Sequence, residues 1–528
     1  MNRKNLTAAV LAGLAGAAGI VGSAQAVNIN PDGLGQVLIY PYYTVNGGNT
    51  TLLSVVNTTG ATKAVKVRFT EGQNTREVLD FNLYMSMYDV WTAALYDDAG
   101  TPTMVTSDTT CTVPYIYGNG GKQAFLPYAL TDGGSTDISR ATEGHFEMIE
   151  MGEIVDGTTT DIAATHVNGV PGSGDLGCHT LVEAWTDPNN LDPDDDGYWL
   201  MDPIADFDEG GPTGGLFGGA AIVNVKKGTM FSYDAKAING FSDSVLGSDG
   251  FLHQEPGSVL PSLNSGNIGV GTVFLDDGTT HTSSAWSRTV DAVSFVFMHD
   301  QVMNEYTTEA AVNAGTEWVM TFPTKHFYVY GPSAGDEVPL PVDPFTSQWD
   351  PEFAEDAACE LVVLDTIWDR EEREIIDPEN PGTPIPPIVS PAPPDLPPPT
   401  NPEIPLELCY EVSVIAFGPE KTPRAEGGTT AILGSSNFHN IDNELLGFEY
   451  GWARLDFSGW DYDLNGDGVE DPGEVFDRVP LGGLVGLPVT GFAVQKFENG
   501  FLDGNTLANY GGIFQHKATR SLVLVSPQ

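Results

Sequence analysis

Short apolar runs with a period of two residues recur between turn residues from about residue 36 to 105. In the run AVKVRF, Val65, Val67 and Phe69 fall on one face of a strand, and Lys66 and Arg68 fall on the other. The run VLDFNLYM repeats this alternation, which is typical of strands with one face on a core and one in solvent. With turns at roughly ten-residue spacing, residues 27–105 predict an antiparallel immunoglobulin-like β-sandwich, either alone or continuous with the next segment.

Residues 106–345 keep this β-like composition but contain long loops rich in Gly, Asp and Thr. We expect strands at HFEMIEM, AAIVNV, VDAVSFVFM and EWVMTFPTKHFYVY. Short helices are an alternative for some of these runs, and residues 307–313 are the best candidate. The segment therefore predicts a decorated β-rich domain within an all-β protein.

The composition changes abruptly after residue 377, where 13 prolines occur in the 28 residues from Pro378 to Pro405. Proline fixes φ and has no N–H to donate, so this stretch predicts an extended polyproline II segment outside any core. We expect a third, C-terminal β domain over residues 346–528. The Pro-rich loop, residues 377–406, either projects from this domain or links two domains.

The four cysteines, Cys111, Cys178, Cys359 and Cys409, each begin an apolar run that looks like a strand. An even number of cysteines in an exported chain predicts disulfides, and four cysteines allow three pairings. We favour Cys111 with Cys178 and Cys359 with Cys409, because these pairs are near neighbours along the chain. Metal thiolates or a catalytic thiol are the alternatives, although no C-x-x-C spacing is present.

The first 26 residues have the pattern of a cleavable signal peptide. Arg3 and Lys4 precede a small-residue apolar stretch, and Ala24-Gln25-Ala26 forms the cleavage site. The formal net charge of −50 comes from 72 acidic and only 22 basic residues. A field this negative makes nucleic acid an improbable partner and is compatible with a saline or calcium-containing exterior. We expect a mature chain without a transmembrane segment that is extracellular or at the cell surface after Sec-type export, with the periplasm as the alternative.

The sharpest chemical motif is DLNGDGVEDPGE, residues 463–474, which matches the spacing of a calcium loop. Calcium prefers six to eight oxygen ligands, which alternating acidic side chains on a tight loop can supply. The predicted ligands of this structural Ca²⁺ are Asp463, Asn465, Asp467, the Val469 carbonyl, Asp471 and Glu474. The flanking residues do not resemble the paired helices of an EF-hand, so the string is closer to a thrombospondin type 3 loop. A solvated turn is the alternative.

A weaker acidic loop, DPDDDGYW, places Asp192, Asp194 and Asp196 ahead of a glycine, with Asp202 or Asp206 in place of the final Glu. An ordinary acidic loop is the favoured interpretation here.

Strong catalytic motifs are missing from the sequence, including G-x-S-x-G, H-E-x-x-H and a phosphate loop followed by Lys. His145 and Glu147 would share one face of a strand and could hold a metal with His166 or His179. A strand histidine with local hydrogen bonds is the simpler interpretation.

The segments GLGQVLIYPYYTV, LLSVVNTT, ATEGHFEMIEMGEI, FPTKHFYV and LPVTGFAVQ resemble, over most of the mature chain, a group of exported Gram-negative cell-surface proteins with Ig-like sandwich domains. The resemblance implies a surface location and carries no catalytic residue. The leading hypothesis is a non-enzymatic structural or adhesive surface protein, calcium-stabilised and capable of self-association. The alternatives are a carbohydrate-binding surface protein that uses surface aromatics and calcium, and an exported hydrolase. The tyrosines of YPYYTV could line a glycan groove, but packing within the sandwich is the favoured interpretation.

Overall fold

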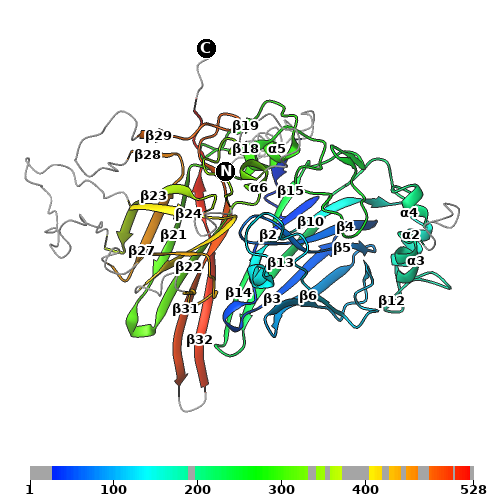
Figure 1. The fold of residues 1–528 in the computed structure, drawn as a ribbon, viewed down its shortest axis with the longest axis horizontal. Coiled ribbons are helices and arrows are strands. Elements are labelled where there is room, and N and C mark those ends of the chain that lie inside the picture. The colour runs from blue at the N-terminus through cyan, green and yellow to red at the C-terminus, as the bar shows by residue number, and fades with distance from the viewer. Residues whose placement is uncertain are drawn as a thin grey trace, which may run out of the picture.

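The structure, a computed structural model, describes residues 26–187, 197–330, 340–350, 357–371, 404–418, 427–441, 448–461, 475–502 and 506–523. It confirms the all-β prediction, because 45% of the described chain is in strands and only 10% in helices, and the strands form several mainly antiparallel sheets (Figure 1). Residues 1–25 of the predicted signal peptide, residues 372–403 of the Pro-rich segment and both acidic loops fall outside the described residues.

The N-terminal half forms one sandwich of two sheets. Its seven-stranded sheet has the order β1 (Asn28–Ile29), β15 (Lys236–Asn239), β2 (Val37–Thr44), β10 (Glu143–Ile154), β4 (Thr62–Glu71), β5 (Glu77–Met85) and β8 (Cys111–Val113). Its six-stranded sheet has the order β14 (Thr229–Asp234), β13 (Leu216–Asn224), β3 (Thr50–Asn57), β6 (Val90–Asp98), β7 (Thr101–Val105) and β9 (Lys122–Ala124). The two sheets share one apolar core, in which Val65, Val67 and Phe69 of β4 face Leu53 and Trp91 of β3 and β6.

The C-terminal half forms a second pair of five-stranded sheets. One has the order β24 (Ile404–Leu408), β23 (Glu360–Asp369), β27 (Tyr450–Asp456), β21 (Gln301–Thr307) and β33 (Lys517–Thr519). The other has the order β26 (Phe438–Ile441), β25 (Val412–Phe417), β22 (Ala314–Thr321), β31 (Thr490–Leu502) and β32 (Thr506–Gln515). All pairings within these two sheets are antiparallel except the parallel pair of β25 and β26.

The central strands of the sheet that contains β22 are buried on both faces and join the two halves. Val319 and Phe492 pack into the core of the first sandwich, whereas Trp318 and Ala493 pack into the second core. The Phe492 ring stacks on Tyr233 of β14, with 4.8 Å between the ring centroids. Strands buried on both faces favour continuous apolar runs, and short runs of this kind occur in β22 (WVM), β25 (VIAF) and β31 (FAV).

Sheet pairing crosses residues 105 and 345, and at residue 105 it agrees with the alternative of a sandwich continuous with the next segment. Strand β3 pairs with β13, so residues 27–105 share a sheet with residues beyond 106. Strand β22 pairs with β25 and β31, so the C-terminal sandwich takes strands from the expected middle segment. The sandwiches therefore divide the described chain near residue 300, and the immunoglobulin-like strand order stays a prediction.

Helices and small hairpins cover the outer face of the seven-stranded sheet. The helices are α2 (Thr159–Ala164), α3 (Cys178–Glu183), α4 (Tyr198–Met201), α5 (Thr289–Phe297) and α6 (His326–Val329). The hairpins pair β11 (His166–Val167) with β12 (Val170–Pro171), β16 (Leu246–Gly247) with β17 (Gly250–Phe251), and β18 (Thr272–Phe274) with β19 (Thr280–Thr282). The remaining short elements are the pair β20 (Met298–His299) and β30 (Leu487–Pro488), the pair β28 (Gly459–Asp461) and β29 (Val475–Asp477), and the 3-10 turns η2 (Asn46–Gly48), η3 (Ile138–Thr142) and η5 (Ala310–Val312).

Two runs expected as strands are helices, and in a third, EWVMTFPTKHFYVY, the residues HFYV form α6. VDAVSFVFM forms α5, and the run that begins at Cys178 forms α3. Eight of the nine residues of α5 are buried, so the helix has no solvent-facing polar stripe that would reveal its period. Within the region expected to be helical, residues 307–313, the structure has only the single turn η5.

Candidate functional site

A cavity of about 880 Å³ lies over the outer face of the seven-stranded sheet, where it meets α6. Its floor comes from β4 and β10, and its walls come from α6 and several loops. The lining residues are Arg68, Thr75, Glu147, Asp249, Val259, Leu260, Ser262, Asn264, Arg288, Pro323, His326, Phe327, Tyr330, Leu340, Val342 and Gln348. This volume falls within the range of small-molecule sites, roughly 300–1,000 Å³.

The floor of the cavity is a buried ion-pair network centred on Arg68. The Arg68 guanidinium pairs with Glu147 on β10, and its Nε donates to Glu77 on β5 at 2.9 Å. Lys66, two residues along β4, pairs with Asp80. The sequence pattern placed Lys66 and Arg68 on a solvent face, and this expectation is wrong: Lys66 is fully buried and Arg68 is 7% exposed.

Burial and pairing set the charge of this floor. Burial lowers the pKa of Arg68, but Glu147 and Glu77 more than offset that effect, so the pKa of Arg68 is raised and the side chain stays cationic. Burial raises the pKa of Glu147, and the neighbouring Arg68 opposes that rise. The network thus holds each charged group against its partner and orients the Arg68 head group at the base of the cavity.

Aromatic rings and a neutral histidine form the wall next to α6. His326 lies 5.5 Å from the Tyr330 ring between centroids, and the Arg76 guanidinium lies 5.6 Å from the same ring. Burial, followed by the charges of Arg76 and Arg68, lowers the pKa of His326 to about 4. His326 is therefore uncharged at neutral pH and offers an imidazole that can donate or accept a hydrogen bond.

Planar polar side chains also line the cavity. Arg288 is partly exposed, and its Nη2 donates to the Phe327 carbonyl oxygen at 3.3 Å. Its guanidinium lies 5.1 Å from the Tyr328 ring centroid, which fixes the plane of the head group. Asp249 accepts a hydrogen bond from Ser265 Oγ at 3.1 Å, and Asn264 Oδ1 accepts one from Val290 N at 3.4 Å.

His145 and Glu147, the pair considered as metal ligands, lie on the same buried face of β10, but the described structure gives His145 a different role. His145 contacts Thr70 at 3.3 Å, and burial lowers its pKa to about 3. His166 lies elsewhere, where it contacts Ser86 and Thr109 at 3.3 Å. Within the described residues, the one group of three that meets metal-ligand geometry contains Cys359 and Cys409, which are joined in a disulfide and offer no thiolates.

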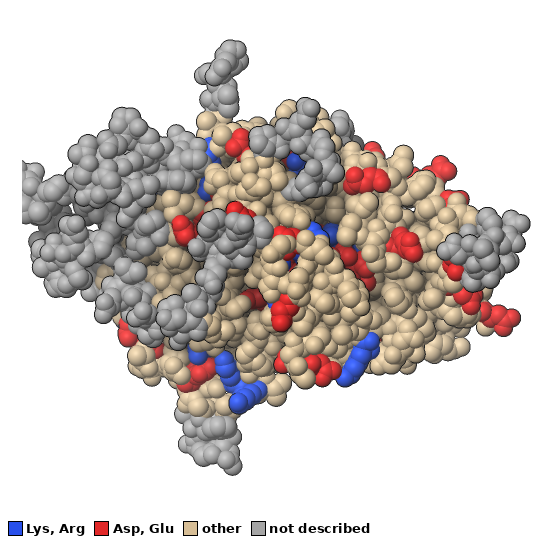
Figure 2. All heavy atoms as spheres, viewed as in Figure 1, with Lys and Arg blue, Asp and Glu red and all other residues tan. Residues whose placement is uncertain are grey.

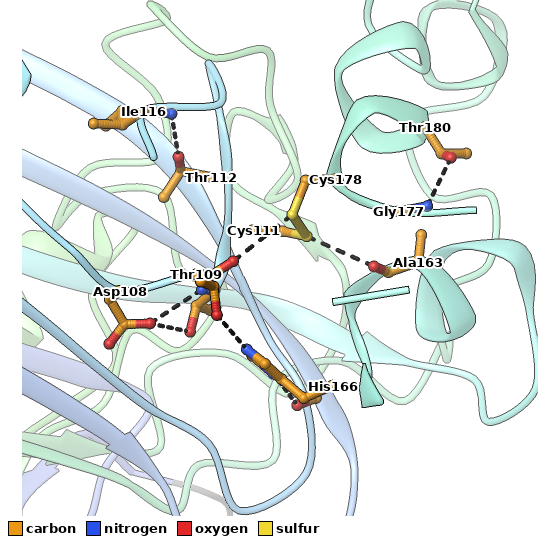
Figure 3. Close-up of a disulfide and its surroundings, with 12 residues drawn as sticks. Asp108, Thr109, Cys111, Thr112, Ile116, Ala163, His166, Gly177, Cys178 and Thr180 are labelled. Carbon is orange, nitrogen blue, oxygen red and sulfur yellow. Dashed lines mark hydrogen bonds between the residues drawn. A yellow bond between two sulfur atoms is a disulfide. The ribbon is translucent and has the colours of Figure 1, made fainter. Parts of the chain in front are cut away.

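The structure contains both expected disulfides, Cys111–Cys178 and Cys359–Cys409. Figure 3 shows the first, which ties α3 to β8 at the edge of the seven-stranded sheet. Cys111 Sγ lies 3.6 Å from the Ala163 carbonyl oxygen of α2, so the bridge also sits against the second helix of this layer. The disulfide therefore anchors part of the segment that covers the charged sheet face.

The predicted calcium ligands Asp463, Asn465, Asp467, Val469, Asp471 and Glu474, and the weaker set Asp192, Asp194 and Asp196, lie outside the described residues. Asp206, considered as a substitute ligand, accepts hydrogen bonds from Thr160 N at 3.0 Å and Thr160 Oγ1 at 2.8 Å. The tyrosines of YPYYTV, considered as glycan-groove candidates, are buried: Tyr40, Tyr42 and Tyr43 are each 0% exposed.

A scan against protein-family models, a search of curated proteins and a search of solved structures each found no match. Among the described residues, no helix has the length and apolar character needed to cross a membrane.

Proposed function

We propose that this chain is a non-enzymatic adhesive protein of the cell exterior that binds a saccharide in the cavity over β4 and β10. The observation that carries the proposal is the composition of the cavity walls. Tyr330 and Phe327 offer aromatic surface, and Arg288, Asn264 and Gln348 offer planar polar groups. Sugars present C–H faces that pack on aromatic rings and hydroxyls that bond to such polar groups, so the lining matches their chemistry.

Binding without turnover is supported by the state of the titratable groups in the lining. Glu147 is held in an ion pair with Arg68, and burial lowers the pKa of His326 to about 4. A general acid and base need protons that they can exchange near the working pH. Groups held in ion pairs or kept neutral by burial lack that freedom, so an exported hydrolase is the less favoured alternative.

The test is a glycan array of the mature chain followed by calorimetry with any sugar retained. Tyr330→Ala and Arg288→Ala should each weaken binding at least tenfold, and Tyr128→Ala is the matched control because Tyr128 is 80% exposed away from the cavity. An array without binders would contradict the proposal, as would binding that both cavity variants leave unchanged. Screening the retained sugar as a hydrolysis substrate separates binding from catalysis.

Export and calcium binding remain part of the proposal on sequence grounds. Two disulfides are compatible with an extracellular location. Fractionation and surface imaging of native cells would test the location. A calcium titration of the full chain beside Asp463→Asn and Asp467→Asn would test the loop, with loss of calcium heat in the variants as the expected result.

A further inference from the structure

The middle of the outer face of the six-stranded sheet is exposed and carries no charged side chain. Charged residues lie at its margins: Asp234 on β14, Asp98 at the end of β6 and Lys122 on β9. Its outward residues form rows across the strands, because Ala221 pairs with Ser232 and Leu52, and Leu52 pairs in turn with Ala94. A second row joins Gly219, Ser54 and Thr92. Ala94 extends the first row to Val105 on β7. We call this surface the uncharged face.

The centre of the uncharged face is a shallow trough of about 670 Å³. Gly219, Ala221, Ser54 and Ala94 have small side chains, so the backbone there is open to close approach. Larger apolar residues border it, with Leu52 43%, Phe217 42% and Met230 55% exposed. Among the residues that line the trough, Asp234 is the one charged group.

This neutrality stands out in a chain with 72 acidic residues and a net charge of −50. Figure 2 shows acidic side chains spread over the face that it draws, with fewer basic ones. Two such molecules repel each other through most relative orientations, and salt weakens that repulsion. A basic partner would be drawn to the acidic surface, so the uncharged face suits a partner that is itself uncharged at the contact. Another copy of this chain brings such a surface.

We propose that a second copy of the chain docks here, with the two uncharged faces packed sheet against sheet around a twofold axis. Twofold contacts are self-complementary, which fits a face whose rows mix Ser, Ala, Leu and Thr without opposite charges to match. Sheets pack about 10 Å apart, and the small residues of the trough permit that spacing. Leu52 of each copy then fills the trough of the other.

The dimensions of the face set the expected strength. Five strands about 4.8 Å apart and about 3.3 Å of rise per residue give a surface of roughly 20 Å by 25 Å. This is at the small end of specific interfaces, so we expect a dissociation constant in the micromolar range. The contact is independent of the saccharide cavity, and failure of either proposal leaves the other standing.

The experiment is sedimentation velocity of the mature chain over a concentration series at low and high salt. We expect a concentration-dependent dimer that strengthens with salt, because salt screens the like charges of the two copies. Leu52→Glu should weaken the dimer at least tenfold, and Ala94→Glu on the neighbouring strand provides a second, independent variant. Val170→Glu is the control, since Val170 is 57% exposed on β12, away from this face.

Melting temperatures of the three variants confirm that each is folded, and the outward positions of Leu52 and Ala94 make this the expected result. A chain that stays monomeric at high salt would overturn the proposal. A dimer that Leu52→Glu and Ala94→Glu leave unchanged would overturn it as well, as would a dimer that high salt dissociates, because that behaviour belongs to a contact between opposite charges.

Discussion

The two outer faces of the first sandwich invert the usual relation between charge and exposure. The seven-stranded sheet carries Lys66, Arg68 and Glu147 on its outer face, and the chain then buries them under helices and loops. The six-stranded sheet carries Ser54, Leu52 and other uncharged residues on its outer face and leaves them exposed. The charge on a sheet face therefore does not determine whether that face is exposed to solvent. What determines it is whether other segments of the chain pack over the face and pair its charged groups.

The comparison assigns different physical tasks to the two faces. Buried ion pairs contribute little net stability, because desolvation cancels much of their attraction, but removal of one partner is costly. The charged face thus restricts how its covering layer can sit, since each carboxylate must meet its cation. The uncharged face imposes no such restriction and remains open to association.

The largest expected effect comes from Arg68→Ala on the charged face. The variant leaves the buried Glu147 and Glu77 without their shared cation, so we expect a loss of about 3–5 kcal/mol in the free energy of unfolding. Urea denaturation would measure it, with Thr92→Ala on the uncharged face as the matched control, expected within about 0.5 kcal/mol of wild type. A loss below about 1 kcal/mol for Arg68→Ala would show that the covering layer admits water to the pair.

The next effect concerns the disulfide that anchors the covering layer. Cys111 and Cys178 are 67 residues apart in sequence, and the Cys111→Ala/Cys178→Ala double variant removes the tether between β8 and α3. We expect a loss of about 2–4 kcal/mol. Hydrogen exchange should rise in α2, α3 and β8 and stay unchanged in β3 and β13 of the uncharged face. Equal increases in both sheets would contradict a local role for this bridge.

The third prediction uses pH, because the cavity over the charged face is lined by a histidine and the trough of the uncharged face is not. The pKa of His326 is about 4 in the folded chain, below the ordinary value of about 6.5, so the unfolded chain binds more protons between these values. The stability that neutral His326 contributes is full above pH 6.5 and is lost as the pH falls towards 4.

Burial raises the pKa of Glu147, which makes the free energy of unfolding fall as the pH rises, the opposite of the trend for His326. The effect of the histidine is therefore best measured as the difference between a histidine variant and wild type. His326→Gln should reduce the slope of unfolding free energy against pH by up to about 1.4 kcal/mol per pH unit within the window from 6.5 to 4. Parallel curves for variant and wild type would show that His326 titrates normally. The self-association proposed for the uncharged face should vary little over the neutral range.

The sequence pattern correctly predicted which residues of these strands face the core. It did not predict which segments cover the opposite face of the sheet. Alternation located Val65, Val67 and Phe69 in the core correctly. It assigned Lys66 and Arg68 to solvent, because a period of two separates two faces without saying which segment packs on each. Buried pairing depends on Asp80 and Glu147 from other strands, which no local window contains.

The length and apolar content of a run explain why α5 was expected as a strand, and the scatter of its lining residues along the chain explains why the cavity was not predicted. An apolar run of nine residues such as α5 fits a buried strand or a buried helix equally well, and periodicity alone does not separate them. The cavity draws Arg68, Asp249, Arg288, His326 and Gln348 from five separate segments, so no spacing motif marks it. One signal for the buried ion pairs was present in the sequence. The chain has only 22 basic residues, and an arginine inside an apolar run, such as Arg68, needs a buried acidic partner.

The smallest effect on folding, and the sharpest contrast between the faces, is expected from Leu52→Ser. Leu52 is 43% exposed at the edge of the trough, so its loss should change the free energy of unfolding by at most about 1 kcal/mol. The same substitution removes the residue proposed to fill the trough of a second copy, and should weaken the dimer several-fold in sedimentation. If the variant loses stability but still forms the dimer, the proposal is contradicted. Leu52 would then stabilise the fold, and the dimer would form through another surface.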